Sequence, residues 1–115
     1  MTPHLRFERQ DPAGWTLAEG PQRLGEIHPD HMIFVGFPDA EATQAAADAA
    51  LRVLQQWRLA RREQDHSATA VSISADGTSF TLTVPAGMWY ALLLELAQRI
   101  HAATRSLRHL EPELV

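Results

Sequence analysis

The chain of 115 residues is long enough for one domain, residues 1–115, that buries about two-thirds of its unfolded surface on folding. It has no cysteine, which excludes disulfides, thiolate metal sites and cysteine nucleophiles. Its net charge of −4 repels phosphate backbones on average, so nucleic acid is not an expected partner.

The first ten residues include Arg6, Glu8 and Arg9 and lack the apolar stretch of a secretory signal. The longest uncharged apolar stretch, Val84–Leu94, is well short of the ~20 residues that a membrane-spanning helix requires. These two features favour a cytoplasmic protein that does not enter a membrane.

Short apolar segments alternate with turn residues over the first third of the chain. This pattern predicts strands over the ranges 5–10, 15–19, 24–28 and 31–37. Within the last of these, Met-Ile-Phe-Val at 32–35 is apolar on both faces, which is typical of a strand in the middle of a sheet.

A helix is predicted over residues 39–62. Asp39 follows a strand end and is suited to cap the free N–H groups of the first turn. Apolar residues then recur at steps of three and four, at Ala46, Ala50, Val53, Trp57 and Ala60. Because this stripe is rich in alanine, the helix can approach its neighbour closely. Residues 63–68 form a candidate linker.

The dipeptide Asp76-Gly77 stands between two alternating segments and predicts a hairpin with a two-residue turn. This turn places apolar side chains on one face of the hairpin, in the pairs Val71 with Leu82 and Ile73 with Phe80. Serine and threonine occupy the other face. A shift of one residue would move the apolar set into water, so we expect this register to be well determined.

A second helix is predicted from Pro85 to Leu110. Proline is tolerated in the first turn, where its missing N–H would have been unpaired. Apolar residues follow a heptad rhythm, at Trp89, Leu93, Leu96, Ile100, Ala103, Leu107 and Leu110. The segment 88–94 is apolar nearly all round, so we expect it to be covered on more than one side.

The expected fold is therefore α+β, with the order β-β-β-β-α-β-β-α, a largely antiparallel sheet and both long helices packed on one of its faces. This layout is similar to the fold of small acidic dimeric secretion chaperones, which also combine two helices with a strand meander. The chain departs from them by lacking a leading helix. No motif allows any residue of theirs to be carried over, so the resemblance concerns the fold alone.

The second helix is expected to be longer than the sheet that it covers. At ~1.5 Å per residue, residues 85–110 would extend over about 39 Å, whereas six strands of about six residues make a sheet of about 24 by 20 Å. The excess apolar surface predicts a homodimer, with an interface at Trp89, Leu93, Leu96, Ile100, Leu107 and Leu110. The alternative is that the last turns fold back on the first helix or fray after Ser106.

His28, Asp30 and His31 form a compact group of side chains that can bind a metal ion such as zinc. A complete site would need a further ligand, for which Asp65 or His66 are candidates. The alternative is a solvated turn, because Pro-Asp is ordinary turn chemistry.

His101, Arg105 and Arg108 share one face of the second predicted helix, about 130° from its apolar seam. They form a candidate patch for an anion, a nucleic-acid backbone or an acidic partner. The alternative is a solvated face that complements the negative end of the helix dipole.

No G-x-S-x-G elbow and no glycine-rich phosphate loop occurs in the sequence, so nucleophilic catalysis has no support. We therefore expect a non-enzymatic interaction or adaptor module without a cofactor, acting as a homodimer that presents a sheet face or a helix groove to a protein partner. The alternative is a small-ligand or metal-binding protein, with enzymes included, that uses residues from the set His28, Asp30, His31, His66 and His101. The two hypotheses differ in whether these groups converge on one point.

Overall fold

The computed structural model describes residues 5–10, 14–60, 71–84 and 89–108, except the side chains of residues 58–60. Its elements in chain order are β1 (Leu5–Arg9), β2 (Trp15–Glu19), β3 (Gln22–Ile27), β4 (His31–Phe34), α1 (Ala40–Ala60), β5 (Val71–Ile73), β6 (Phe80–Thr83), α2 (Tyr90–Thr104) and the 3₁₀ helix η1 (Arg105–Leu107). The predicted α+β class and the predicted order of strands and helices are confirmed. The predicted linker at 63–68 lies outside the described residues.

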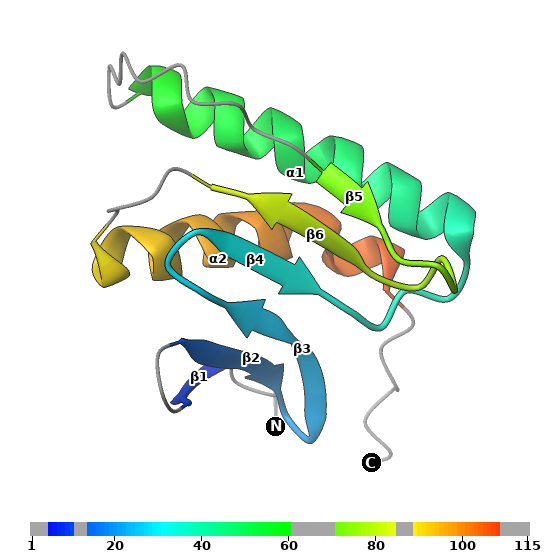
Figure 1. Ribbon diagram of the computed structural model, residues 1–115, viewed down its shortest axis with the longest axis horizontal. Coiled ribbons are helices and arrows are strands. Elements are labelled where there is room, and N and C mark those ends of the chain that lie inside the picture. Colours follow the sequence, from blue (N-terminus) through cyan, green and yellow to red (C-terminus); the bar gives the residue numbers. More distant parts are fainter. Residues whose placement is uncertain (1–4, 11–13, 61–70, 85–88, 109–115) are drawn as a thin grey trace.

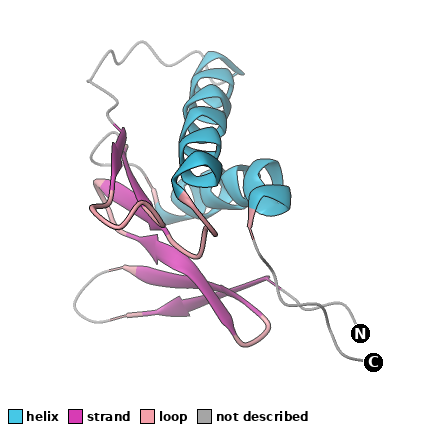
Figure 2. Ribbon diagram, turned by 90° about the vertical axis from the view of Figure 1, so that its right-hand side faces the viewer, coloured by secondary structure: helices cyan, strands magenta, loops and turns pink. Residues whose placement is uncertain are grey.

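The six strands form one antiparallel sheet in the order β1-β2-β3-β4-β6-β5. Both helices cover the same face of this sheet and run in opposite directions (Figures 1 and 2). Because β4 stands between β3 and β6, the apolar segment at 32–34 occupies the middle of the sheet, as predicted. Helices cover only one of its two faces, so Ile33 on the other face is half-buried.

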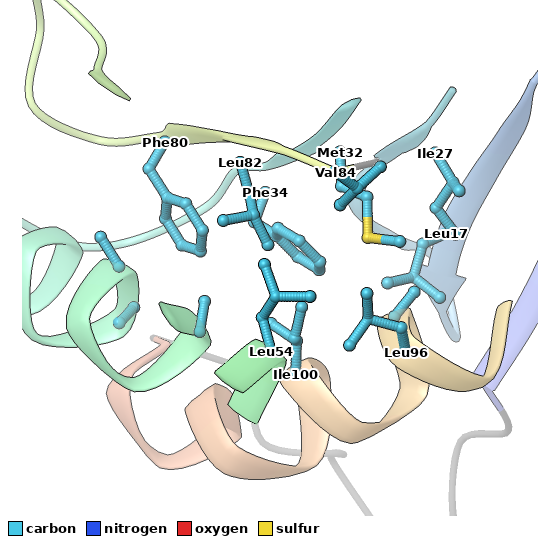
Figure 3. Packing of buried hydrophobic residues seen from close by; sticks show 14 of the residues in the cluster. Leu17, Ile27, Met32, Phe34, Leu54, Phe80, Leu82, Val84, Leu96 and Ile100 are labelled. Carbon is cyan, nitrogen blue, oxygen red and sulfur yellow. The ribbon is translucent and has the colours of Figure 1, made fainter. Parts of the chain in front are cut away.

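The core lies between the sheet and the helices. Met32 pairs with Leu82 and Phe34 with Phe80 across β4 and β6, and all four side chains are at most 1% exposed. Figure 3 shows these side chains pointing from the sheet toward apolar residues of the two helices, among them Leu54, Leu96 and Ile100. Alternation along each strand explains the arrangement, because every second side chain points to the helix side.

The predicted register of the β5–β6 hairpin is confirmed, since Val71 faces Leu82 and Ile73 faces Phe80. The turn itself differs from the predicted two-residue type. The N–H of Gly77 donates to the carbonyl of Ser74 at 3.0 Å, and Gly77 adopts a φ of +72°. The strands therefore keep their pairing while the turn is wider, with Gly77 in the left-handed region that glycine tolerates best.

Helix α1 begins as predicted after Asp39, whose Oδ1 accepts a hydrogen bond from the N–H of Ala42 at 2.8 Å. Its alanines Ala46, Ala47 and Ala50 are fully buried, which allows the helix to lie close to its neighbours. At its first turn the buried hydroxyl of Thr43 shares its one hydrogen between the carbonyl oxygens of Asp39, at 2.8 Å, and Gly77, at 2.6 Å, and the contact with Gly77 joins the helix to the hairpin turn.

The register between β2 and β3 shifts between Leu17 and Ala18. Next to this irregularity, a Cβ on Gly25 would lie 2.0 Å from the carbonyl oxygen of Ile33 on β4. No other side chain fits this position without a movement of the backbone, so Gly25 fixes the close approach of β3 and β4.

Candidate protein-binding groove

Helix α2 is shorter than predicted, with 15 residues over Tyr90–Thr104. At ~1.5 Å per residue it extends over roughly 22 Å, close to the width of the sheet. The predicted overhang is therefore wrong, and with it the geometric reason for placing a second copy on this helix. The predicted helix start at Pro85 and the predicted end at Leu110 lie outside the described residues.

The apolar seam predicted along α2 is covered within a single copy over its central part. Leu93, Leu96 and Ile100 are 0% exposed because they pack against the sheet and α1, so they cannot meet a second copy. Trp89 is 79% exposed, since it precedes the helix with an extended backbone and does not share the seam's direction. Leu107 is half-buried in η1.

The buried face of α2 continues through polar residues rather than through the predicted Ala103. His101 is 5% exposed and Thr104 is fully buried, whereas Ala103 faces solvent. A straight helix of 3.6 residues per turn drifts about 20° per heptad from a 3.5-residue repeat. The drift carries His101 and Thr104 into the core-facing position, and sequence reasoning missed them because it assigned polar residues to the surface.

Two residues of the predicted anion patch, His101 and Arg108, are buried, and the third, Arg105, forms an ion pair. Arg105 is half-exposed, and its guanidinium donates to the Glu19 carboxylate at 3.3 and 3.4 Å. The same carboxylate lies 3.6 Å from Nε2 of His101, too far for a hydrogen bond, and both ring nitrogens of His101 lack a partner within the described structure. The open cationic face that we expected does not form.

The pKa of His101 is lowered from its ordinary value of 6.5, mainly by burial and then by the charge of Arg108, while Glu19 acts in the opposite direction. Burial also lowers the pKa of Arg108 to about 10, again opposed by Glu19. Arg108 therefore remains charged at neutral pH, and His101 is held in its neutral form.

Arg108 joins the end of the described chain to the sheet. Its guanidinium donates to the carbonyl of Leu24 at 3.1 Å and to the carbonyl of Val35, and it lies 4.6 Å from the centre of the Phe37 ring. These contacts give a donor to the Val35 carbonyl and a second donor to the Leu24 carbonyl, which also accepts the Val35 N–H at 2.8 Å, at the end of the β3–β4 pair. The role of Arg108 in this structure is thus to fix η1 against the sheet.

The predicted metal ligands lie at the β3–β4 turn. The rings of His28 and His31 stack with their centres 4.5 Å apart, and Nδ1 of His31 lies 2.6 Å from Oδ1 of Asp30. This contact, followed by the charges of both histidines, lowers the pKa of Asp30. No three metal-capable side chains converge anywhere in the described part of the chain. His101 lies elsewhere beside Glu19, and Asp65 and His66 lie outside the described residues.

A groove of about 780 Å³ runs between the two helices. It is lined by Val53, Gln56 and Trp57 of α1 and by Glu95, Arg99, Ala102 and Ala103 of α2. The apolar lining residues come from both helices. Glu95 and Arg99, one turn apart on α2, form an ion pair of 3.3 Å at the groove and remain partly exposed.

The residues on each side of the groove follow from their spacing along the helix. On α2, Glu95, Arg99 and Ala102 stand at steps of four and three, on the face opposite to the buried residues. On α1, Trp57 turns toward the core and is only 5% exposed, yet it still reaches the groove wall. Sequence reasoning anticipated a helix groove but not its residues, because the pairing of the two helices depends on the sheet beneath them.

A second exposed apolar feature lies at the start of α2. Tyr90 is 46% exposed and its ring meets that of half-buried Trp15 on β2 edge to face, with centres 6.2 Å apart. Trp89 stands beside it. These rings fix the beginning of α2 against β2, since such aromatic pairs add to the stabilisation from burial alone.

Neither helix in the described ranges combines the length and the apolar content needed to cross a bilayer. Comparison with protein-family models, with curated proteins and with solved structures found no match to this chain. Its function has therefore to be inferred from the surfaces that the fold presents.

Proposed function

We propose that this protein is a non-enzymatic interaction module that binds an amphipathic helix of a partner protein in the groove between α1 and α2. The observation that carries this proposal is the groove itself, with apolar and small side chains from two helices and an ion pair beside them. A helix laid in a groove of this kind inserts its apolar side chains at steps of three and four.

The dimensions and the residue types of the groove suit a helix. Packed helices approach to 8–10 Å, and small side chains allow the closer distances. Ala102 and Ala103 provide such a surface on α2, and Val53 and Trp57 face it from α1. The partner helix would press its apolar stripe on these four residues.

The charges of the groove favour a partner helix that carries both signs along one flank. Glu95 and Arg99 are 42% and 60% exposed at their side chains, in the order Glu then Arg. Such rim charges contribute more to orientation and to the rate of association than to affinity. A partner with an acidic residue near Arg99 and a basic one near Glu95 would bind in one direction only.

The alternative hypothesis, a metal or ligand site, has no specific observation in its favour. The groups that it needs do not converge: His28, Asp30 and His31 belong to a turn, whereas His101 is buried beside Glu19. Within the described residues, the sequence-based condition for preferring a binding or catalytic site is not met.

The proposal is tested with a display library of random peptides several helical turns long, selected on the purified protein. We expect enrichment of sequences with apolar residues at positions i, i+3 or i+4, and i+7. Chemically synthesised copies of these peptides should become helical on binding, measured by circular dichroism, and should bind measurably in calorimetry.

A matched pair of variants places the binding in the groove. Ala102→Arg fills the groove, and Ala45→Arg puts the same side chain on an exposed position of α1 away from it. Arginine is a good helix former, so both variants should fold. Ala102→Arg should weaken binding at least about tenfold, and Ala45→Arg should leave it unchanged. Absence of enrichment, or equal binding to both variants, contradicts the proposal.

A further inference from the structure

Strand β1 forms one edge of the sheet and, in the part of the chain that the structure describes, pairs only with β2. The pairing is regular from Leu5 to Arg9, with no bulge and no proline. Edge strands carry unpaired backbone groups that template association with another chain unless a bulge, a proline or an unopposed charge prevents it. On β1 only the charges remain as protection.

The hydrogen bonds of the β1–β2 hairpin determine which backbone groups of β1 point outward. The N–H of Gln10 donates to the carbonyl of Gly14 at 3.0 Å, one step beyond the pair of Arg9 with Trp15. Bonded and non-bonded positions alternate along antiparallel strands. The backbone groups of Arg6 and Glu8 therefore point to β2, and those of Leu5, Phe7 and Arg9 point to the opposite edge, where no described strand lies.

Two of the three charges on β1, Arg6 and Glu8, have opposite signs and flank Phe7 at equal steps. Arg6 and Glu8 lie on the sheet face away from the helices, exposed, and pair with each other at 3.2 Å. A second β1 that ran antiparallel about an axis at Phe7 would set Arg6 opposite the partner's Glu8, and Glu8 opposite the partner's Arg6. Opposite charges at such directly facing positions stabilise a strand pair, whereas like charges destabilise it.

The helix-side face of β1 carries apolar side chains that one copy leaves half-covered. Leu5 and Phe7 pack against the edge of the core and remain partly exposed. β1 lies at the edge of the sheet farthest from β5 and α1 (Figure 1). In the antiparallel arrangement Phe7 meets the partner's Phe7, and Leu5 lies beside the aliphatic part of the partner's Arg9.

We infer that two copies of this chain associate through β1, as antiparallel strands about a two-fold axis at Phe7. The three outward residues of each β1 then exchange hydrogen bonds with those of the other, and the two sheets become continuous. Three independent properties agree with this axis: the phase of the backbone groups, the opposite charges of Arg6 and Glu8, and the half-covered apolar face. The inference keeps the predicted homodimer but moves its interface from the buried α2 seam to β1.

The α1–α2 groove stays open in this dimer, because it is formed by the helices and does not include β1. A dimer would thus present two grooves to its partners. The β1 interface and the groove are independent, so a protein could lack either one and keep the other.

The experiment uses charge reversal on β1 with the full chain, followed by size-exclusion chromatography with light scattering. The wild-type protein should elute with twice the mass of the 12.8 kDa chain at high micromolar concentration. Arg6→Glu and Glu8→Arg each place like charges opposite one another at both symmetric contacts. Each variant alone should raise the dissociation constant at least about tenfold.

An equimolar mixture of the two variants is the decisive sample. At positions 6 and 8, one chain then carries two acidic residues and the other carries two basic residues. A mixed pair therefore regains opposite charges at both contacts. We expect the mixture to recover the dimeric mass, and the double variant Arg6→Glu/Glu8→Arg to dimerise alone. Circular dichroism and thermal unfolding check that each single variant is folded.

Three results would overturn the inference: a monomeric wild type at high micromolar concentration, a dimer that neither reversal weakens, or a mixture that stays monomeric although both chains are folded. None of these results bears on the groove proposal, because the peptide-binding experiment tests a different surface, the groove between α1 and α2. As a matched control, the charge reversal Arg52→Glu, at an exposed position of α1 outside both β1 and the groove, should leave the dimeric mass unchanged.

Discussion

The centre of the sheet and its β1 edge are built from the same alternating pattern but differ in how well they are covered. On β4 and β6, the inward side chains Met32 and Leu82 are 0% exposed beneath the helices. On β1, the inward side chains Leu5 and Phe7 remain partly exposed. The alternation of side chains along a strand thus determines which face of the sheet each one takes. The position of the helices determines whether that face is shielded from water.

The two regions should differ most in how far the loss of one phenylalanine ring lowers the free energy of unfolding. Phe34→Ala removes a ring that is 1% exposed and should lower the free energy of unfolding by about 3–5 kcal/mol. Phe7→Ala should cost about 1 kcal/mol, because its ring is only half-covered in one copy. Urea unfolding at low protein concentration, where the proposed β1 dimer would dissociate, measures both. Equal losses would contradict the contrast between the regions.

A second contrast concerns the arginines at the end of the helix-covered region. Arg108→Ala removes two charge-assisted hydrogen bonds of a buried guanidinium, to the carbonyls of Val35 and Leu24, and should cost about 2–3 kcal/mol. Arg105→Ala breaks a half-exposed pair with Glu19 and should cost less than about 1 kcal/mol. Chemical denaturation of the two variants gives the comparison. If Arg105→Ala proved the more damaging, η1 would not be held as described.

Loss of the cap of α1 should lower the free energy of unfolding by a smaller amount. Asp39→Ala removes the acceptor for the Ala42 N–H and should lower the free energy of unfolding by about 1 kcal/mol. Asp39→Asn, which keeps an acceptor oxygen, should restore most of the loss. Thermal or urea unfolding distinguishes these variants, and an asparagine as harmful as alanine would show that the cap is not the reason.

The smallest expected effect is the pH dependence from His101. Burial and the charges of Arg108 and Arg105 lower its pKa below 6.5, and Glu19 opposes them. The folded chain therefore binds this proton less well than the unfolded chain. The stabilisation is complete above pH 6.5 and declines as the pH falls toward the folded pKa, because the unfolded state takes up more protons.

Replacement of the histidine isolates this contribution. His101→Gln should flatten the decline of the free energy of unfolding below pH 6.5. Denaturation curves at a series of pH values measure the slope. An unchanged slope in His101→Gln would exclude His101 as its source.

Local chemistry made much of the fold predictable. The β5–β6 register followed from Asp76-Gly77 and the alternation around it, and the start of α1 followed from Asp39. The end of α2 did not follow, because the buried Arg108 is stabilised by groups distant in sequence, the carbonyls of Leu24 and Val35. A sequence shows that such residues are polar but not that partners meet them.

For the candidate binding surfaces, the sequence indicated the type of surface but not the residues that form it. A sheet face or a helix groove was expected as the binding surface, but Trp57 and Ala102 are brought together by a sheet whose strand order no local pattern reveals. The heptad spacing of α2 also suggested an exposed seam that the structure buries at Leu93 and Leu96. Conversely, the symmetry of Arg6 and Glu8 becomes meaningful only once β1 is known to be an edge strand.

The most direct test of the β1 interface is amide hydrogen exchange, followed residue by residue with NMR as the protein concentration is raised. The N–H groups of Arg6 and Glu8 point to β2 and should be protected at every concentration. The N–H groups of Phe7 and Arg9 should exchange quickly in dilute samples and become protected in step with the dimeric mass. Rapid exchange at Phe7 and Arg9 in a sample that is fully dimeric would contradict the account.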